Sequence, residues 1–173
     1  MEYSALKEKI DPVYFKHSCL KDNDSLIKII QENKITGSKC VEIGTYKGIS
    51  AAILTNFFDE IYTFDVEEHK EKYEIWAKMQ IWHKIRSFVL PGRSEIKKTI
   101  ETLQAIYGKI TVGFIDAVHN YNNVKADTEM LMSLGIKKIL YHDADVPGIA
   151  LYLSEIKAVT FYNQFGLWEA KEK

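Results

Sequence analysis

Six charged or titratable residues stand at or just after the ends of short apolar runs in this chain. Carboxylates accept hydrogen bonds from hydroxyl and amino groups, and imidazoles exchange protons near neutral pH. If the apolar runs are parallel strands of one sheet, these groups meet at its carboxyl edge, where open α/β sheets bind ligands. The residues are Glu42, Asp65, Asp116, His119, His142 and Asp143.

The segment Val41 to Ser50 contains a glycine turn between a strand and a helix. Gly44 allows the chain to turn sharply off the strand, because glycine tolerates positive φ. Gly48 lets the first turn of the helix approach the sheet or a ligand. The free N–H groups of that turn then point toward whatever lies above the strand end.

The spacing of these glycines excludes two phosphate-binding motifs. A dinucleotide fold needs G-x-G-x-x-G and a P-loop ends in Gly-Lys-Ser/Thr, whereas here Thr45-Tyr46-Lys47 separates only two glycines. The remaining interpretation is a nucleoside without phosphate. Glu42 could meet its amino group, and Asp65, about 20 residues further on, could accept hydrogen bonds from two ribose hydroxyls. S-adenosylmethionine, with a ribose, an amino-acid tail and a sulfonium, fits this description.

Three segments carry a resemblance to a known family. Glu42 to Ala51 resembles the first motif of class I S-adenosylmethionine-dependent methyltransferases, in the form used by small-molecule O-methyltransferases. Phe114 to Asp127 resembles the D-x-D-H-S-Y-x-x-V-x-x-D signature of one branch, similar to methyltransferase domain family 24. Ile139 to Asp143 resembles the following strand, which commonly ends in His-Asp. The resemblance covers residues 38–150.

The alternation of apolar strands and helices itself predicts a parallel sheet with right-handed crossovers. The resemblance implies an α/β fold that is Rossmann-like and doubly wound, a three-layer α/β/α structure. Its mostly parallel seven-stranded sheet would carry an antiparallel C-terminal strand. We expect one domain over residues 1–173, with an N-terminal helical arm or lid at 1–37 and a catalytic core at 38–173.

The patterning places the elements as follows. A first helix should follow Asn23-Asp24-Ser25 and end at Gly37. Trp76 and Trp82 are expected to pack against the sheet from a later helix. The expected strands are 39–43, 60–65, 86–90, 110–116, 137–142, 159–162 and 167–170, and the helices between them 49–56, 67–82, 93–107, 122–134 and 147–157.

Cofactor contacts are predicted from the glycine turn, from the end of the second strand and from two later loops. The resemblance implies that the loop after the third strand passes beside the adenine, although Ser94 could instead cap the next helix. The predicted cofactor residues are Glu42, Gly44, Thr45, Tyr46, Gly48, Ser50, Asp65, Val66, Gly92, Arg93, Ser94 and Asp116.

Methyl transfer to an alcohol or phenol requires a positioned nucleophile that loses its proton. His119 or His142 could act as a general base beside Asp116, and these three are the candidate catalytic residues. A divalent cation could do the same work. The resemblance implies cation ligands at Asp116, His142 and Asp143, yet Mg²⁺ prefers oxygen ligands, and a valine replaces the second acid of the signature. The alternative is that these side chains only cap loops.

The composition and charge of the chain limit its expected partners and compartment. The 173 residues carry a formal net charge of -1, so nothing attracts nucleic acid or an anionic membrane in general. No apolar run reaches the about 18 residues that span a bilayer. Cys19 and Cys40 are expected to be reduced thiols, and we expect a cytoplasmic protein. The sequence Asp116-Ala117-Val118-His119 is unlike the Asn/Asp-Pro-Pro loop of nucleobase methyltransferases.

The sequence therefore predicts an S-adenosylmethionine-dependent methyltransferase acting on a hydroxyl of a small molecule, such as a sugar or natural product. Because no large cap is inserted, either the acceptor binds shallowly or a second subunit of a homodimer closes the site. Two alternatives stay open: a binding or accessory protein that keeps the fold without turnover, and a hydroxylase-like relative on the same scaffold.

Overall fold

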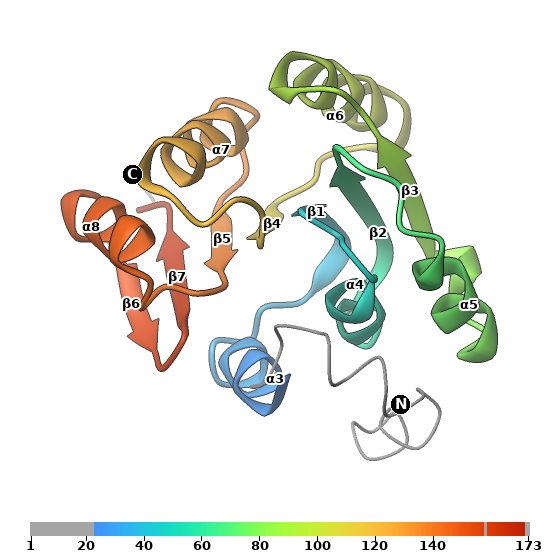
Figure 1. Ribbon diagram of the computed structural model, residues 1–173, viewed down its shortest axis with the longest axis horizontal. Helices are drawn as coiled ribbons and strands as arrows, with labels where there is room; N and C mark the ends of the chain where they lie inside the picture. The colour runs from blue at the N-terminus through green and yellow to red at the C-terminus, as the bar shows by residue number, and fades with distance from the viewer. Residues whose placement is uncertain (1–22, 158, 172–173) are drawn as a thin grey trace.

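A computed structural model of the protein describes residues 23–157 and 159–171. Seven strands form one sheet in the order β3-β2-β1-β4-β5-β7-β6 (Figure 1). Strands β1 to β5 are parallel to one another, β7 is antiparallel to β5, and β6 is antiparallel to β7. The predicted doubly wound fold, with its antiparallel C-terminal strand, is confirmed.

Helices cover both faces of the sheet. Helices α3, α4 and α5 share one apolar cluster with the sheet, and α6, α7 and α8 share the other. The strands are β1 (Gly37–Ile43), β2 (Phe58–Asp65), β3 (Ile85–Val89), β4 (Val112–Ile115), β5 (Lys138–Tyr141), β6 (Val159–Tyr162) and β7 (Phe165–Glu169). The helices are α3 (Asn23–Glu32), α4 (Ile49–Leu54), α5 (Glu71–Lys78), α6 (Arg93–Tyr107), α7 (Tyr121–Ser133) and α8 (Pro147–Glu155), with a 3₁₀ turn, η1 (Trp82–Lys84).

Successive residues of β1 show why both faces must be covered. Cys40 lies in the cluster beneath α4, whereas Val41 and Ile43 lie in the cluster beneath α6 and α7. Side chains alternate between the faces of a strand, so a central parallel strand that is apolar at both is buried on both sides. Glu42 therefore points to the α4 side, and it is the one acid in this buried stretch.

The N-terminal helix is part of the core. Leu26, Ile29 and Ile30 of α3 are fully buried in the same cluster as α4 and α5. The packing of this helix before the first strand is as predicted. The rest of the predicted arm or lid, residues 1–22, lies outside the described residues, and so does Cys19.

The segment between β2 and β3 differs from the prediction. The helix expected over 67–82 spans only Glu71–Lys78, because Gln80 takes a left-handed conformation with φ 57° and the chain continues into η1. Trp82 is 67% exposed as a result, so its predicted packing against the sheet is wrong. Ser94 also does not cap α6, because Gly92 occupies the cap position.

Trp76 holds the start of α4 in place. Its indole N–H donates to the carbonyl of Gly48 at 2.8 Å, and both groups are buried. Gly48 precedes α4 with φ 74°, and a Cβ there would lie 2.6 Å from the indole ring. No other residue type can occupy this position without displacing the ring, so the turn and the α5 packing depend on each other.

The Gly48→Ala variant should be less stable than Gly135→Ala. Both positions have positive φ, at 74° and 79°, but only Gly48 has atoms within contact distance of a new Cβ. Backbone strain costs about 1–3 kcal/mol at either site, and the clash should add about 1–3 kcal/mol at Gly48. Urea unfolding of both variants measures the difference. Equal destabilisation would show that the indole moves aside freely.

Candidate functional site

A cavity of about 590 Å³ opens at the carboxyl ends of four neighbouring strands. Its wall consists of the turn after β1, the end of β2, the loop from β3 to α6 and the loop after β4. Of the predicted cofactor residues, all line this cavity except Glu42 and Ser94, within the described part of the chain. The fold therefore brings together residues that lie up to about 75 positions apart in the sequence.

The turn after β1 lies directly against the end of β4. Gly44 has φ 89°, and a Cβ there would be 2.3 Å from the carbonyl oxygen of Asp116. The N–H of Asp116 donates to the carbonyl of Ile43 at 2.9 Å. Glycine is thus required at this position because of its positive φ and because a Cβ would overlap the Asp116 backbone. The contact between the turn and β4 closes one side of the cavity.

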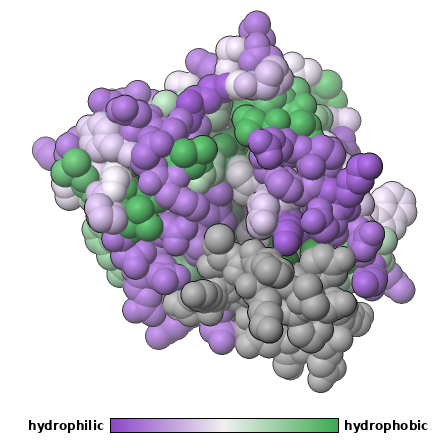
Figure 2. Space-filling view, in the orientation of Figure 1, coloured by the Kyte–Doolittle hydropathy of each residue, from purple (hydrophilic) through white to green (hydrophobic). Residues whose placement is uncertain are grey.

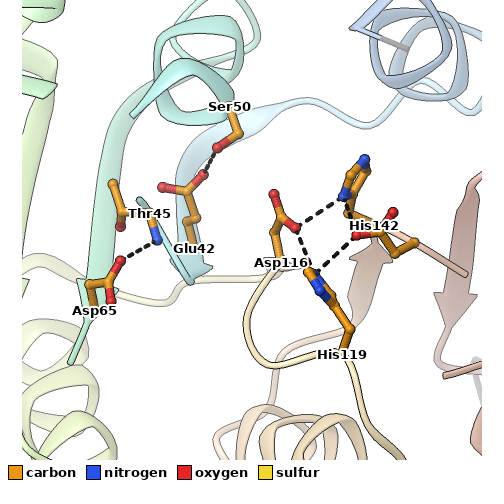
Figure 3. A network of polar contacts seen from close by, with 8 residues as sticks. Glu42, Thr45, Ser50, Asp65, Asp116, His119 and His142 are labelled. Carbon is orange, nitrogen blue, oxygen red and sulfur yellow. Dashed lines mark hydrogen bonds and ion pairs between the residues drawn. The ribbon is translucent and has the colours of Figure 1, made fainter. Parts of the chain in front are cut away.

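Asp65 fixes the same turn from the other side. Its Oδ2 accepts the N–H groups of Thr45 at 3.1 Å and Tyr46 at 2.8 Å. Its Oδ1 accepts the N–H groups of Val66 at 2.7 Å and Glu67 at 3.3 Å. The carboxylate is consequently held in one orientation at the edge of the cavity (Figure 3).

Glu42 lies behind the cavity wall. Its side chain is fully buried, and Ser50 donates a hydrogen bond of 2.5 Å to its Oε1 (Figure 3). Its Oε2 has no hydrogen-bond partner among the described residues. Burial raises the pKa of this carboxyl to about 8, against the opposing effect of the Ser50 hydrogen bond. The protonated form therefore predominates at neutral pH, and a nearby cation would favour ionisation.

Two carboxylates and two imidazoles form a ring just after the ends of β4 and β5. Asp116 Oδ1 lies 3.0 Å from His142 Nδ1 and 3.5 Å from His119 Nε2. Asp143 Oδ2 lies 3.1 Å from His142 Nδ1 and 3.0 Å from His119 Nε2. Acids and imidazoles thus alternate around the ring, as Figure 3 shows in part. Asp116 and His119 face the cavity, and His142 and Asp143 lie behind them. The predicted catalytic and cation-binding residues are brought together.

The carboxylates favour the charged forms of both imidazoles. The hydrogen bond to Asp116 raises the pKa of His119. Burial lowers the pKa of His142, but its hydrogen bonds to Asp116 and Asp143 outweigh burial and raise it to about 10. Burial raises the pKa of the Asp143 carboxyl. The hydrogen bond from His142 and its charge outweigh burial, so the pKa of Asp143 is lowered overall. Either protons or another cation must therefore balance the two acids.

An ion pair that the sequence does not reveal joins the start of α6 to α7. Arg93 Nε donates to Asp127 Oδ1 at 2.5 Å, and its Nη2 donates to Asn123 Oδ1 at 2.6 Å. Asp127 therefore anchors the first residue of α6 to α7. Tyr121 of the same motif donates to Glu155 of α8 at 2.6 Å, away from the cavity wall. No sequence pattern links Arg93 with Asp127, which lie in different helices.

His69 is a second residue of the site that the sequence did not predict. It lines the cavity, and its ring meets Tyr46 edge-on with 4.7 Å between centroids. Tyr46 is a non-glycine residue with φ 46°. The only signal for His69 was its position in the loop after Asp65. Together the two rings form the rim of the cavity beside the glycine turn.

The fold and these strand-end residues define a class I methyltransferase with a Rossmann-like core. The family described as a methyltransferase domain matches residues 41–138, more than half of the chain, and the protein belongs to it. The resemblance to class I S-adenosylmethionine-dependent methyltransferases, in their O-methyltransferase-like branch, is thereby confirmed. No curated protein sequence matches the chain.

Solved structures share the fold at low sequence identity. An SAH complex of an O-methyltransferase from Bacillus cereus has a TM-score of 0.70 at 15% identity, covering 99% of this chain and 92% of that one. A methyltransferase from Podospora anserina, also SAH-bound, has a TM-score of 0.67 at 14% identity, covering 98% and 86%. An rRNA methylase from Streptococcus thermophilus has a TM-score of 0.61 at 13% identity, covering 90% and 100%.

The surface gives further context. The face in Figure 2 is largely hydrophilic, with hydrophobic residues gathered beside α6 and near the centre. None of the helices in the described part of the chain has both the length and the apolar character needed to cross a membrane.

The buried acid predicts a pH-dependent effect of Glu42→Gln on stability. The folded-state pKa of about 8 exceeds the ordinary value of 4.5, so the stability that the protonated carboxyl contributes is full below pH 4.5 and is lost as the pH rises through 8. Glutamine removes this loss, on the order of 1.4 kcal/mol for each pH unit in that window. The free energy of unfolding of the variant should therefore increase relative to that of the natural protein as the pH rises.

Denaturant unfolding at pH 5, 6.5 and 8 measures this difference. The exposed Glu101→Gln variant is the matched control, since it makes the same chemical change on the surface of α6. A constant difference between Glu42→Gln and the natural protein at all three pH values would rule out a protonated Glu42.

Proposed function

We propose that this protein is an S-adenosylmethionine-dependent methyltransferase that methylates an oxygen atom of a small molecule. One observation carries the proposal. The glycine turn after β1 lies between the Asp65 carboxylate at the end of β2 and the Asp116 and His119 side chains after β4, and all of them line one cavity. A nucleoside site thus faces a group of residues that can take up a proton.

The residues of the cavity fit this cofactor. Asp65 is oriented by four backbone N–H groups at the place where a ribose would bind. Val66, 60% exposed, and Gly92 offer an apolar surface for the adenine. Glu42 does not line the cavity, but its Oε1 accepts from the wall residue Ser50 and its Oε2 is unpartnered among the described residues, so its charge can favour an ammonium group from behind the wall. The cofactor supplies a methyl group bonded to a sulfonium sulfur. The acceptor oxygen bonds to this methyl carbon as the carbon–sulfur bond breaks.

The acceptor's proton is assigned to the acid–imidazole ring. In the metal-free protein His119 lines the cavity, and Asp116 and Asp143 orient its ring through Nε2. Only its neutral form, which the raised pKa shifts to higher pH, can take the proton. His142 holds the two acids in place from behind. Val118, 61% exposed and part of the wall, gives the acceptor an apolar surface.

A small molecule fits better than RNA. The formal net charge of -1 provides no general attraction for a polyanion. One solved structure of similar fold is an rRNA methylase, and another is an O-methyltransferase. The acceptor class is therefore argued from charge and from the ring, and not from these similarities.

Mg²⁺ does not fit the residues that the resemblance implies for it. Asp116 and Asp143 supply carboxylate oxygens, but His142 and His119 direct nitrogens to the same point. Mg²⁺ is a hard ion that prefers an octahedral shell of oxygen atoms. We therefore assign no step of the reaction to Mg²⁺.

Asp65→Ala should weaken S-adenosylmethionine binding by about 10- to 100-fold, because it removes an acceptor of charged hydrogen bonds worth about 1.5–3 kcal/mol. Asp59→Ala, an exposed change near the start of β2, should leave the affinity unchanged. Isothermal titration calorimetry with the cofactor and its demethylated product measures both. If the natural protein binds neither compound, the proposed activity is wrong.

His119→Gln should lower methyl transfer by about 10²- to 10⁴-fold, the usual contribution of a proton-transfer residue. Cofactor affinity should stay within about twofold, because His119 faces the acceptor side. Formation of the demethylated product with a panel of sugar and phenol acceptors measures the rate. His83→Gln, exposed in η1, is the control. Undiminished turnover by His119→Gln would exclude this residue from proton removal.

A further inference from the structure

The acid–imidazole ring has the composition of a metal site of a particular kind. Its four donor atoms lie within 4.8 Å of one another and come from Asp116, His119, His142 and Asp143. Two are imidazole nitrogens and two are carboxylate oxygens. Imidazole suits Zn²⁺, Co²⁺, Ni²⁺ and Fe²⁺, whereas Mg²⁺ and Ca²⁺ select oxygen.

The donors surround a space in which one ion could bind. Neighbouring donors around the ring are 3.0, 3.1, 3.0 and 3.5 Å apart, and all four lie within 4.8 Å of one another. Ligands bonded to a single Zn²⁺ at about 2.0–2.1 Å lie about 3.3 Å from each other when tetrahedral. The neighbouring pairs are close to this value, and the pairs across the ring must approach each other when an ion binds.

The ligand positions are held by the sheet. The N–H of Asp116 donates to Ile43 at 2.9 Å, and the N–H of His142 donates to Ile115 at 3.0 Å, so both residues continue the ladders of β4 and β5. The His142 ring is fully buried and packs on Phe165, with 5.0 Å between centroids. Its Nδ1 points between the two carboxylates and cannot turn to solvent.

We propose that these four residues bind one first-row transition-metal ion, such as Zn²⁺ or Co²⁺, in preference to Mg²⁺. One divalent ion balances the two carboxylates while both imidazoles stay neutral. His119 is a fourth ligand beyond the three that the sequence resemblance implies. The selection follows from the donor types, because the Irving–Williams order favours these ions wherever nitrogen ligands are present.

The use of the ion rests on the proposed function, although its binding does not. Asp116 and His119 line the cavity, so an ion between them is within reach of an acceptor hydroxyl. A hydroxyl bound to a divalent cation loses its proton more easily. With an ion bound, His119 Nε2 would be one of its ligands and would not be available to take the acceptor's proton. Proton removal by His119 belongs to the metal-free form only.

Titration of the full chain, first dialysed against EDTA, tests the selectivity. We expect one Zn²⁺ per chain by calorimetry and elemental analysis, with an affinity at least about 100-fold above that for Mg²⁺. Co²⁺ should give visible absorption bands, which report its ligands directly in the natural protein. Equal affinity for Mg²⁺ and Zn²⁺, or a Co²⁺ spectrum equal to that of the aqueous ion, would overturn the proposal.

Variants then locate the ion. His119→Ala and Asp143→Asn should each lower Zn²⁺ affinity by about 100-fold or more and change the Co²⁺ spectrum. Asp145→Asn, two residues from a ligand but outside the ring, and His69→Ala, on the same cavity, should change neither. If both ring variants bind Zn²⁺ like the natural protein, the site lies elsewhere and the proposal fails.

The cofactor titration separates the two proposals. If the EDTA-treated protein binds S-adenosylmethionine but no Zn²⁺, the metal inference is wrong and the methyltransferase proposal stands. If it binds Zn²⁺ with the expected selectivity but no cofactor, the metal inference stands and only its use in methyl transfer is lost. A variant that fails to fold is recognised by circular dichroism, and the Co²⁺ spectrum of the natural protein then decides.

Discussion

The close approach of Gly44 to the backbone of Asp116 is the contact on which the whole site depends. The missing Cβ allows the turn after β1 to lie against the end of β4, where a side-chain atom would be 2.3 Å from a carbonyl oxygen. This contact determines how far the cofactor residues of the turn lie from the ring residues that follow β4. Asp65 then fixes the turn by accepting its N–H groups. A wider turn would enlarge the cavity and separate the two sets of residues, so the spacing needed for in-line transfer is set by the backbone.

The site contains two buried titratable groups, although buried polar groups such as Lys72 and Thr63 also occur elsewhere in the core. Glu42 is fully buried with one unpartnered oxygen among the described residues, and His142 is fully buried with its Nδ1 facing two acids. Burying such groups costs free energy unless a partner compensates for lost hydration. The apolar clusters on both faces of the sheet offset that cost. The expected stability gain of Glu42→Gln and the expected binding role of Glu42 have the same origin, since an acid kept protonated by burial becomes favourable when a cation arrives.

Much of this could be predicted from the sequence because it depends on local patterns. Apolar runs, glycines and strand-end acids gave the sheet, the turn and the approximate position of Asp65 and Asp116. The missed features depend on tertiary contacts between distant segments. Arg93 meets Asp127 across two helices, and His69 meets Tyr46 across the cavity rim. The break after α5, which exposes Trp82, arises from one left-handed residue, Gln80, that helical periodicity cannot reveal.

The loop between β4 and α7 is short, and Val118 in it is exposed beside the cavity. Among the described residues, this segment therefore offers an acceptor few side chains apart from the ring. The interaction of an acceptor hydroxyl with the ring would then favour one acceptor over another. If the ring holds protons, an acceptor must give a hydrogen bond to an acid or imidazole. If it holds a transition-metal ion, the four residues already fill a tetrahedral shell, so an acceptor oxygen must enlarge the shell or displace a ligand. Under the proposed function, the occupant of the ring would thus influence both the binding of the acceptor and the route of its proton.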